Sequence, residues 1–321
     1  MKEVNLNGSG WRGLRLALSL ALLKGEQTVF PGGVNILTSD PANLPLYDDI
    51  KRFLFNANCG MLAESGEEIA FYPETIAPGR YSIETGNYSS ITEIQLFIMP
   101  SLFSRGSRSV INYKGVTHSH VSFPTVFIKE TLLGLLEQCG FYASMNMKRF
   151  GYYGSGGGIA ESRIYPAEKK VCVDLLTPRT VSLEGVRIFV AKMDMSLAER
   201  EKEFVLKNIN VTADKVQVME IRDADGFGNS IQVYMKYGNV NVILSRDMEI
   251  YNSAGDLVFD EARYYAALGS LKDEITRFAG TGILPAYIAA EVIPYMVISG
   301  SPVPGVFADA WSCSICKQIL D

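Results

Sequence analysis

The feature of this sequence that most limits its fold is an internal repeat. Lys24-Gly25 and Arg105-Gly106 lie 81 positions apart, and each is followed four residues later by a valine. Cys59-Gly60 and Cys139-Gly140, which lie 80 positions apart, each close an apolar, helix-like segment. A glycine just past the last apolar turn is typical of a helix C-terminus that needs positive φ. The spacing therefore predicts two copies of one supersecondary unit.

A third copy lies near the end of the sequence. Met99-Pro100 lies shortly before Gly106, and Ile293-Pro294 lies at the same distance before Gly300. The second group is shifted from the first by 194 positions. Each copy has the pattern of an amphipathic helix, a glycine turn, a strand and a second helix. Ser90 and the residue three positions later suit a capping box, and Pro124 suits the first turn of a helix. Three such units predict an α/β fold, unless the short matches arose by chance.

Copies two and three lie farther apart in the sequence than copies one and two, so an additional segment is expected between copies two and three. Residues 181–260 have a strand, helix and strand pattern of their own, and Gly238-Asn239 is a turn signal within it. We predict an inserted unit of about 80 residues. Its expected elements are strands at 186–190, 216–221, 230–237 and 239–244 and a charged helix at 197–208.

Composition and charge narrow the classes of function. The net charge is −5 with no basic tail or stripe, so protein partners are favoured over direct RNA binding. Leu14–Leu23 is interrupted by Arg15 and is too short to span a bilayer, which predicts a buried helix, an intracellular protein and no membrane partner. Five scattered cysteines favour buried thiols. Cys313-x-x-Cys316 lacks two further ligands nearby, so neither a metal site nor a cofactor is expected.

Two arginines follow the glycine-rich turn at Gly8. Arg12 and Arg15 lie where the start of a helix could hold a phosphate or an acidic loop of a partner. Intramolecular salt bridges are an equal alternative. The glycines at 156–158 lack the lysine and hydroxyl residue of a phosphate-binding loop, so a backbone requirement is the favoured explanation.

The two histidines alternate with small polar residues. His118 and His120 would share one face if the segment were a strand, but no third ligand accompanies them. His120 is instead expected to donate or accept a hydrogen bond in a cleft. Lys148-Arg149, Arg105 and Arg108 are candidate contacts for RNA or a partner, or simply solvated surface residues.

Several motifs, in this order and spacing, resemble the RNA 3′-terminal phosphate cyclase family. The resemblance implies three β-α-β-α-β-β units that form a large domain, here residues 1–180 and 261–321, with a smaller inserted α/β domain at 181–260. The motifs are Gly8 to Leu20, Phe71 to Thr75 followed by Gly79, Arg149 to Tyr153 leading to Gly158, and Gly226 to Asn229.

The same resemblance indicates that catalysis is lost. The family's enzymes attach a nucleotide to a histidine of a Ser-x-His-x-x-Thr-Asn stretch, and here Ser314 occupies the nucleophile position within Ser312 to Gln318. Gly8-Ser9 replaces a glutamate of the first turn, and Asp40 and Asp48 lie where phosphate-holding residues are expected. Acidic residues there would repel a polyphosphate. The expected remnant is a vestigial anion or partner site lined by Arg12, Arg15, Lys114, His120 and Arg149.

Within the family, Gly8-Ser9, the segment from Lys114 to His120 and the segment from Tyr295 to Ile298 resemble the eukaryotic cyclase-like proteins of ribosome biogenesis. That branch implies a nuclear, nucleolar factor of the small-subunit processome, bound to a ribosome-assembly GTPase during 18S rRNA processing, with pre-rRNA contacted indirectly. One alternative is an ATP-dependent cyclase that uses Ser314 or His120 as nucleophile. A nuclease ranks last, because no carboxylate cluster for two metals is visible in the sequence.

Overall fold

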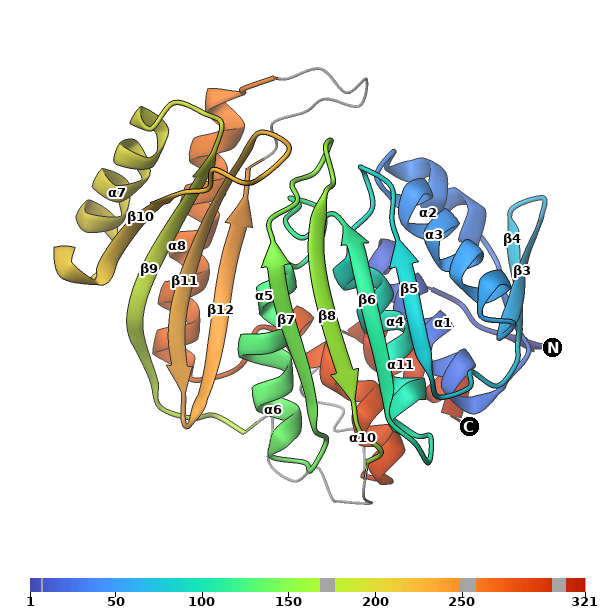
Figure 1. The fold of residues 1–321 in the computed structure, drawn as a ribbon. Helices are drawn as coiled ribbons and strands as arrows, with labels where there is room; N and C mark the ends of the chain where they lie inside the picture. The colour runs from blue at the N-terminus through green and yellow to red at the C-terminus, as the bar shows by residue number, and fades with distance from the viewer. Residues whose placement is uncertain (7, 168–176, 249–257, 302–309, 321) are drawn as a thin grey trace.

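The computed structural model describes residues 1–6, 8–167, 177–248, 258–301 and 310–320. Within them the chain forms three four-stranded sheets, each covered by helices on one side (Figure 1). Two sheets belong to repeated units and the third to the inserted unit. This is the mixed α/β architecture that the repeat predicts.

The first repeat forms a sheet in the order β1-β2-β4-β3, in which β1 and β2 are parallel. Helix α1 is almost wholly buried and ends at the predicted glycine turn, where Gly25 has a left-handed φ of 71°. The helix end predicted at Gly60 is wrong, because the preceding helix ends at Asn56 and Gly60 begins a strand. The elements are β1 (Lys2–Glu3), α1 (Gly10–Lys24), β2 (Thr28–Phe30), α2 (Gly33–Ser39), α3 (Asn43–Asn56), β3 (Gly60–Ser65) and β4 (Glu68–Pro73).

The second repeat has the same order of elements, and its sheet order is β5-β6-β8-β7. Helices α1 and α4 begin 81 residues apart, at Gly10 and Ile91, which confirms the first spacing. The elements are β5 (Arg80–Glu84), α4 (Ile91–Phe103), β6 (Ser109–Gly115), α5 (Thr125–Phe127), the π-helical turn η1 (Ile128–Leu132), α6 (Leu133–Glu137), β7 (Ala143–Arg149) and β8 (Gly158–Ile164).

The start of α4 differs in one respect from the predicted capping box. The Ser90 hydroxyl accepts a hydrogen bond from the backbone N–H of Thr92 at 3.2 Å, as a cap should. Glu93 does not reach back to the cap, because its carboxylate is engaged by side chains of α1. The position that looked like a cap is thus part of a contact between two repeats.

The inserted unit closely follows its prediction. Its sheet has the order β10-β9-β11-β12, and Gly238 turns the β11–β12 hairpin with a φ of 56°. Helix α8 begins after the predicted boundary at residue 260 but packs against β9 and β12, so in space it covers the inserted sheet. The elements are β9 (Val181–Ala191), α7 (Ser196–Asn208), η2 (Ala213–Lys215), β10 (Val216–Glu220), β11 (Gly228–Tyr237), β12 (Val240–Asp247) and α8 (Glu261–Thr281).

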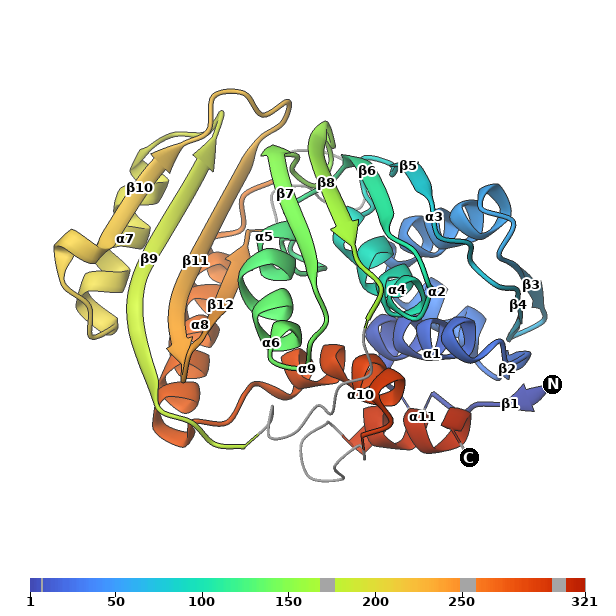
Figure 2. The same cartoon turned by 60° about the horizontal axis from the view of Figure 1, so that its bottom comes forward.

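The described part of the third repeat is helical. It consists of α9 (Ala286–Ala289), the single turn η3 (Ala290–Val292), α10 (Ile293–Ser299) and α11 (Ala310–Leu320). Helix α10 ends at Gly300 with φ 68°, as the second spacing predicts. Helices α10 and α11 pack on α1, and α10 also packs on α4, so the three repeats meet at their helices (Figure 2).

No single helix in the described ranges is long and apolar enough to cross a membrane. Only α8 taken together with the segment Ala286–Ser299, to which it is bent by 76°, meets that test by length and composition. The thiols of Cys59, Cys139 and Cys316 are buried, as the scattered cysteines predict.

Candidate functional site

The glycine-rich turn before α1 brings two arginines to the junction of the three repeats. Gly8 and Gly10 have φ values of 71° and 61°, so the turn uses the left-handed conformation that glycine adopts without strain. Helix α1 starts at Gly10 and carries Arg12 and Arg15 in its first two turns.

Arg15 is buried between two carboxylates. Its Nε lies 2.8 Å from Glu93 Oε2, and its Nη2 pairs with Glu291 Oε1. The indole Nε1 of Trp11 donates to the same Glu93 oxygen at 2.9 Å. Because Arg15 belongs to α1, Glu93 to α4 and Glu291 to η3, each repeat supplies one member of this group, which we call the Arg15 cluster.

The Arg15 cluster carries no excess positive charge. Burial alone would lower the pKa of Arg15, but the two carboxylates raise it above its ordinary value. Burial also raises the pKa of Glu291, and Arg15 opposes that rise only in part. Of the two alternatives left open for Arg15, the intramolecular salt bridge is the one that the structure shows.

Arg12 lies beside the cluster and contacts aromatic rings. Its guanidinium is 5.0 Å from the ring centres of both Phe123 and Tyr287, a cation–π arrangement. The hydroxyl of Tyr287 donates to Glu274. Arg12 shifted by 81 residues is Glu93, and Glu93 shifted by 194 residues is Tyr287. Equivalent positions of the three repeats therefore lie together at this junction.

The segment after β6 joins this region to the inserted unit. His118 is buried, its Nδ1 lies 2.9 Å from Thr117 Oγ1, and its Nε2 lies 3.2 Å from the side-chain amide of Gln232. Its ring stacks on Phe150 at 4.9 Å. Burial lowers the pKa of His118 to about 3, so the ring is neutral at physiological pH.

His120 is half-buried and packs edge-on against Tyr153 at 4.8 Å. Val116 and His118 form only isolated bridges, so this segment is not the regular strand on which the shared face was predicted. Among the described residues, no group of three His, Cys, Asp or Glu side chains could hold a metal ion.

The motif that starts at Arg149 docks the inserted unit. Arg149 Nη2 pairs with Asp225, and its Nε donates to the carbonyl of Asp223 at 2.8 Å. A Cβ on Gly157, which has φ 75°, would lie 2.1 Å from the Asp225 carboxylate. A Cβ on Gly228 would lie 2.1 Å from the Tyr152 ring. Side chains therefore leave little room for a Cβ at either glycine, and the positive φ of Gly157 agrees with the backbone requirement predicted for 156–158.

Comparison with known proteins identifies the family. The family model described as RNA 3′-terminal phosphate cyclase matches residues 52–310, which is most of the chain. The chain belongs to this family. A relative from Koribacter versatilis named RNA 3′-terminal phosphate cyclase is 25% identical over 194 residues, covering 60% of this chain and 53% of the relative. A relative of the same name from Ralstonia nicotianae is 24% identical over 242 residues, covering 74% of this chain and 66% of the relative.

The chain spans between about half and two thirds of the length of these curated cyclases. Arg12, Arg15 and Ser314 lie outside the matched range 52–310, so their assignment to cyclase positions rests on the motifs quoted above.

Ser314 lies on α11, which packs on α1. The Gln318 side-chain amide donates to the Ser314 hydroxyl at 3.1 Å, and the same amide group exchanges two hydrogen bonds with the backbone of Asn5. An amide cannot accept the proton that a nucleophilic serine must lose. Gln318 thus ties α11 to the chain before α1, and Ser314 at the cyclase position accepts a hydrogen bond from the same amide.

Lys114 completes the predicted set and lies on the open face of the second sheet. It is exposed and pairs with Glu84 on the neighbouring strand at 2.6 Å. Each of the five predicted residues therefore has its own local contact, and the structure does not gather them into one anion site.

Sequence reasoning missed the carboxylates that neutralise these arginines. Glu93, Glu291 and Asp225 gave no motif of their own, although applying the 81-residue shift to Arg12 leads directly to Glu93. The repeat was therefore a signal that places Glu93 at the same junction as α1, although its ion-pair partner is Arg15 and not Arg12. No motif or repeat spacing identifies Asp225, which lies in a loop of the inserted unit.

Proposed function

We propose that this chain is a non-catalytic member of the cyclase family that acts in small-subunit (18S rRNA) processing and assembly. The observation that carries the proposal is the Arg15 cluster, in which one buried cation lies between two buried carboxylates. A bound triphosphate would bring several negative charges to a place that already holds two. At about 4 Å and an effective dielectric constant of about 20, each like-charge pair costs roughly 4 kcal/mol.

The residue at the nucleophile position supports the same proposal. A histidine nitrogen can attack the α-phosphate of a nucleotide and later leave, whereas a serine needs a neighbouring base and gives a more stable ester. Ser314 accepts a hydrogen bond from the Gln318 amide, which is not a base. The site would lack the nucleophile, and the charge of Arg15 would already be compensated by two carboxylates.

The assembly role rests on the branch that the sequence motifs resemble. We propose a ribosome-assembly GTPase and proteins of the small-subunit processome as partners, in the nucleolus, with pre-rRNA contacted through them. The net charge of −5 supports a protein partner. Arg149, a predicted contact, is committed to Asp225, which leaves its charge compensated.

A second candidate is an ATP-dependent RNA 3′-phosphate cyclase with a changed active site. The names of the two relatives favour it. In this candidate His120 is a better nucleophile than His118, because His118 is buried and both of its ring nitrogens have polar neighbours.

One experiment separates the two candidates. The purified chain is incubated with α-³²P-labelled ATP, magnesium and a 3′-phosphorylated RNA oligonucleotide, beside an active cyclase of the family. We expect neither labelled protein nor a 2′,3′-cyclic phosphate. The Ser314→His variant is included and is also expected to stay unlabelled, because the Arg15 cluster remains neutralised. Labelling of the unaltered chain would support the second candidate, and loss of that labelling in His120→Ala or Ser314→Ala would identify the nucleophile.

The assembly role needs its own measurement. Binding of the chain to the full-length assembly GTPase and to a pre-18S RNA fragment is titrated at two salt concentrations. We expect binding to the GTPase that changes little with salt. RNA binding that weakens steeply with salt, without GTPase binding, would contradict the proposed partner.

A further inference from the structure

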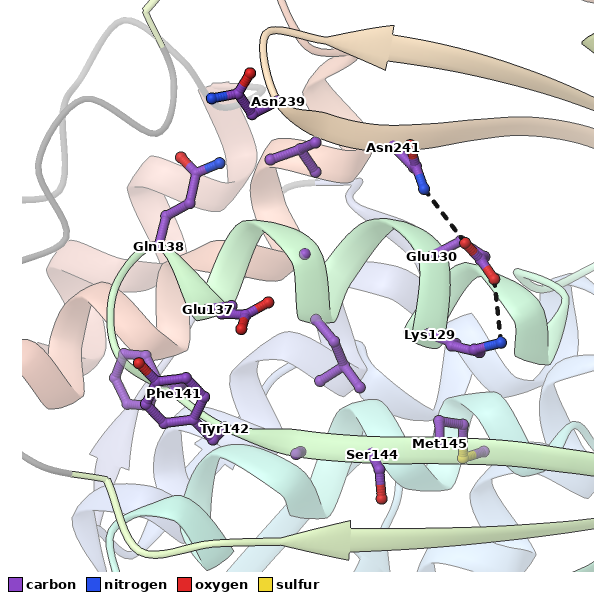
Figure 3. A pocket seen from close by; sticks show the side chains of 14 residues that line it. Lys129, Glu130, Glu137, Gln138, Phe141, Tyr142, Ser144, Met145, Asn239 and Asn241 are labelled. Atoms are coloured by element: carbon purple, nitrogen blue, oxygen red, sulfur yellow. Dashed lines mark hydrogen bonds and ion pairs between the residues drawn. The ribbon is translucent and has the colours of Figure 1, made fainter. Parts of the chain in front are cut away.

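The open edge of β7 borders a groove that no part of the described chain fills. β7 is the last strand of its sheet and, within the described ranges, pairs only with β8. Beside it lies a cavity of about 710 Å³. Figure 3 shows β7 on one side of this cavity, the β11–β12 hairpin on the other, and the helix formed by η1 and α6 between them.

The pairing pattern of β7 tells which backbone groups face the groove. The N–H of Tyr165 donates to the carbonyl of Tyr142, and the register places Ala143 opposite Ile164. Antiparallel strands alternate between residues that bond the neighbour and residues that point away from it. The N–H and C=O groups of Ala143 and Met145 therefore point away from β8, and none of the described residues forms a hydrogen bond with them.

The walls of the groove have the character of a strand-binding site. Its floor is apolar, with Leu133 and Met145, and Gly134 lets Val240 of the hairpin approach closely, since an added Cβ would lie 3.1 Å from that side chain. Its rim is polar. Lys129 is 3.4 Å from Glu130, so the cation of the rim is already paired.

We propose that this groove binds an extended polypeptide segment that adds a strand to β7. A row of outward N–H and C=O groups with two-residue spacing matches another backbone in the β conformation. The side chains of the added strand alternate, so one set contacts the apolar floor and the other faces solvent. Glu137 on the helix of the groove has no ion-pair partner in the described part of the chain, so a lysine or arginine of the segment belongs beside it.

Other occupants fit less well. Among the described residues that line the groove, the charge without an ion-pair partner is the carboxylate of Glu137, which repels a phosphate backbone. A second copy of the chain would have to bring a strand that is already part of a sheet past the β11–β12 hairpin, which forms the opposite wall (Figure 3). A single extended segment needs no such space. The inference does not depend on whether the chain is catalytic.

The first test measures amide exchange in the free chain. We expect the Ser144 amide, which faces β8, to be protected and the amides of Ala143 and Met145 to exchange freely. Protection of all three amides in the free chain would mean that another part of the chain, or a second copy, already covers the edge, and would overturn the proposal.

The second test selects ligands from a displayed library of random twelve-residue peptides, with the full chain as bait. We expect enrichment of sequences that alternate apolar and polar residues and contain a lysine or arginine. Ala143→Pro removes an outward amide while leaving the bonds to β8, and it should weaken binding of the selected peptides by about tenfold. Glu137→Lys should weaken binding by roughly threefold, as expected for a lost surface ion pair.

The matched control is Asn146→Ala, whose side chain is exposed on the other face of β7 and whose amide faces β8. It should bind the peptides as the unaltered chain does. Failure to enrich any sequence, or selected peptides that bind both Ala143→Pro and Glu137→Lys normally, overturns the proposal. So does displacement of the peptides by single-stranded oligouridylate, which would assign the groove to RNA.

Discussion

Removing the charge of Arg15 tests whether the Arg15 cluster is a structural ion group. In Arg15→Met, the carboxylates of Glu93 and Glu291 stay buried without their cation. Breaking a buried ion pair in this way costs about 3–5 kcal/mol of unfolding free energy. We expect that loss at pH 8, measured by urea unfolding followed by tryptophan fluorescence and by circular dichroism.

The pH dependence gives the sign of the effect. Burial raises the pKa of Glu291 and Arg15 opposes that rise, so without Arg15 the folded state binds a proton more readily than the unfolded state does. Stability of the variant should therefore increase as the pH falls from 8 towards 5, and the gap to the unaltered chain should narrow.

The matched control removes all the charges together. Arg15→Met combined with Glu93→Gln and Glu291→Gln leaves no buried charge, and replacing a complete buried ion group by neutral residues is often nearly neutral for stability. We expect the triple variant to recover most of the lost stability. A single variant that loses less than about 1 kcal/mol, or a triple variant as unstable as the single one, would refute the reasoning.

Three further predictions concern the contact between the repeats and the inserted unit. Burial raises the pKa of Asp247 to about 7, so its ionised form opposes folding above that pH; Asp247→Asn should raise the melting temperature at pH 8 and have little effect at pH 5.5. Gly157→Ala should destabilise by about 1–3 kcal/mol and speed proteolysis between the units, because its φ is positive and its Cβ would meet Asp225. Gly269→Ala on α8, where a Cβ meets nothing, should instead stabilise by about 0.5–1 kcal/mol in the same assay. The imidazole of His118, whose pKa burial lowers to about 3, should show no titration between pH 5 and 8 by NMR.

The fold was predictable because its signals are local and repeated. The glycine caps at Gly25 and Gly300 and the hairpin turn at Gly238 lie where the sequence places them, since each depends on a backbone conformation that glycine favours. All the predicted inserted strands are present, although β9 begins at Val181, five residues before its predicted start. The position of α8 was not predictable in the same way, because which sheet a helix covers depends on tertiary packing.

The site was less predictable, because a motif names a residue but not its partner. The positive charge of three arginines made them candidates, namely Arg12, Arg15 and Arg149. In the structure each contacts groups from other parts of the chain, which are aromatic rings for Arg12 and carboxylates for the other two. Those contacts join residues far apart in sequence, such as Arg15 and Glu291. A charge pattern along the chain contains no information about such neutralisation.

The repeat supplies part of that missing information. The positions equivalent to Arg12 in the other two repeats are Glu93 and Tyr287. Glu93 binds Arg15, which lies one helical turn from Arg12. Tyr287 lies against Arg12 itself. Units that pack helix against helix around a common centre bring equivalent positions together, so complementary residues at those positions can replace a bound anion. The same positions that could hold a nucleotide in an enzyme then hold the repeats to one another. A chain built in this way can keep the family fold without a ligand, as the proposed non-catalytic role requires.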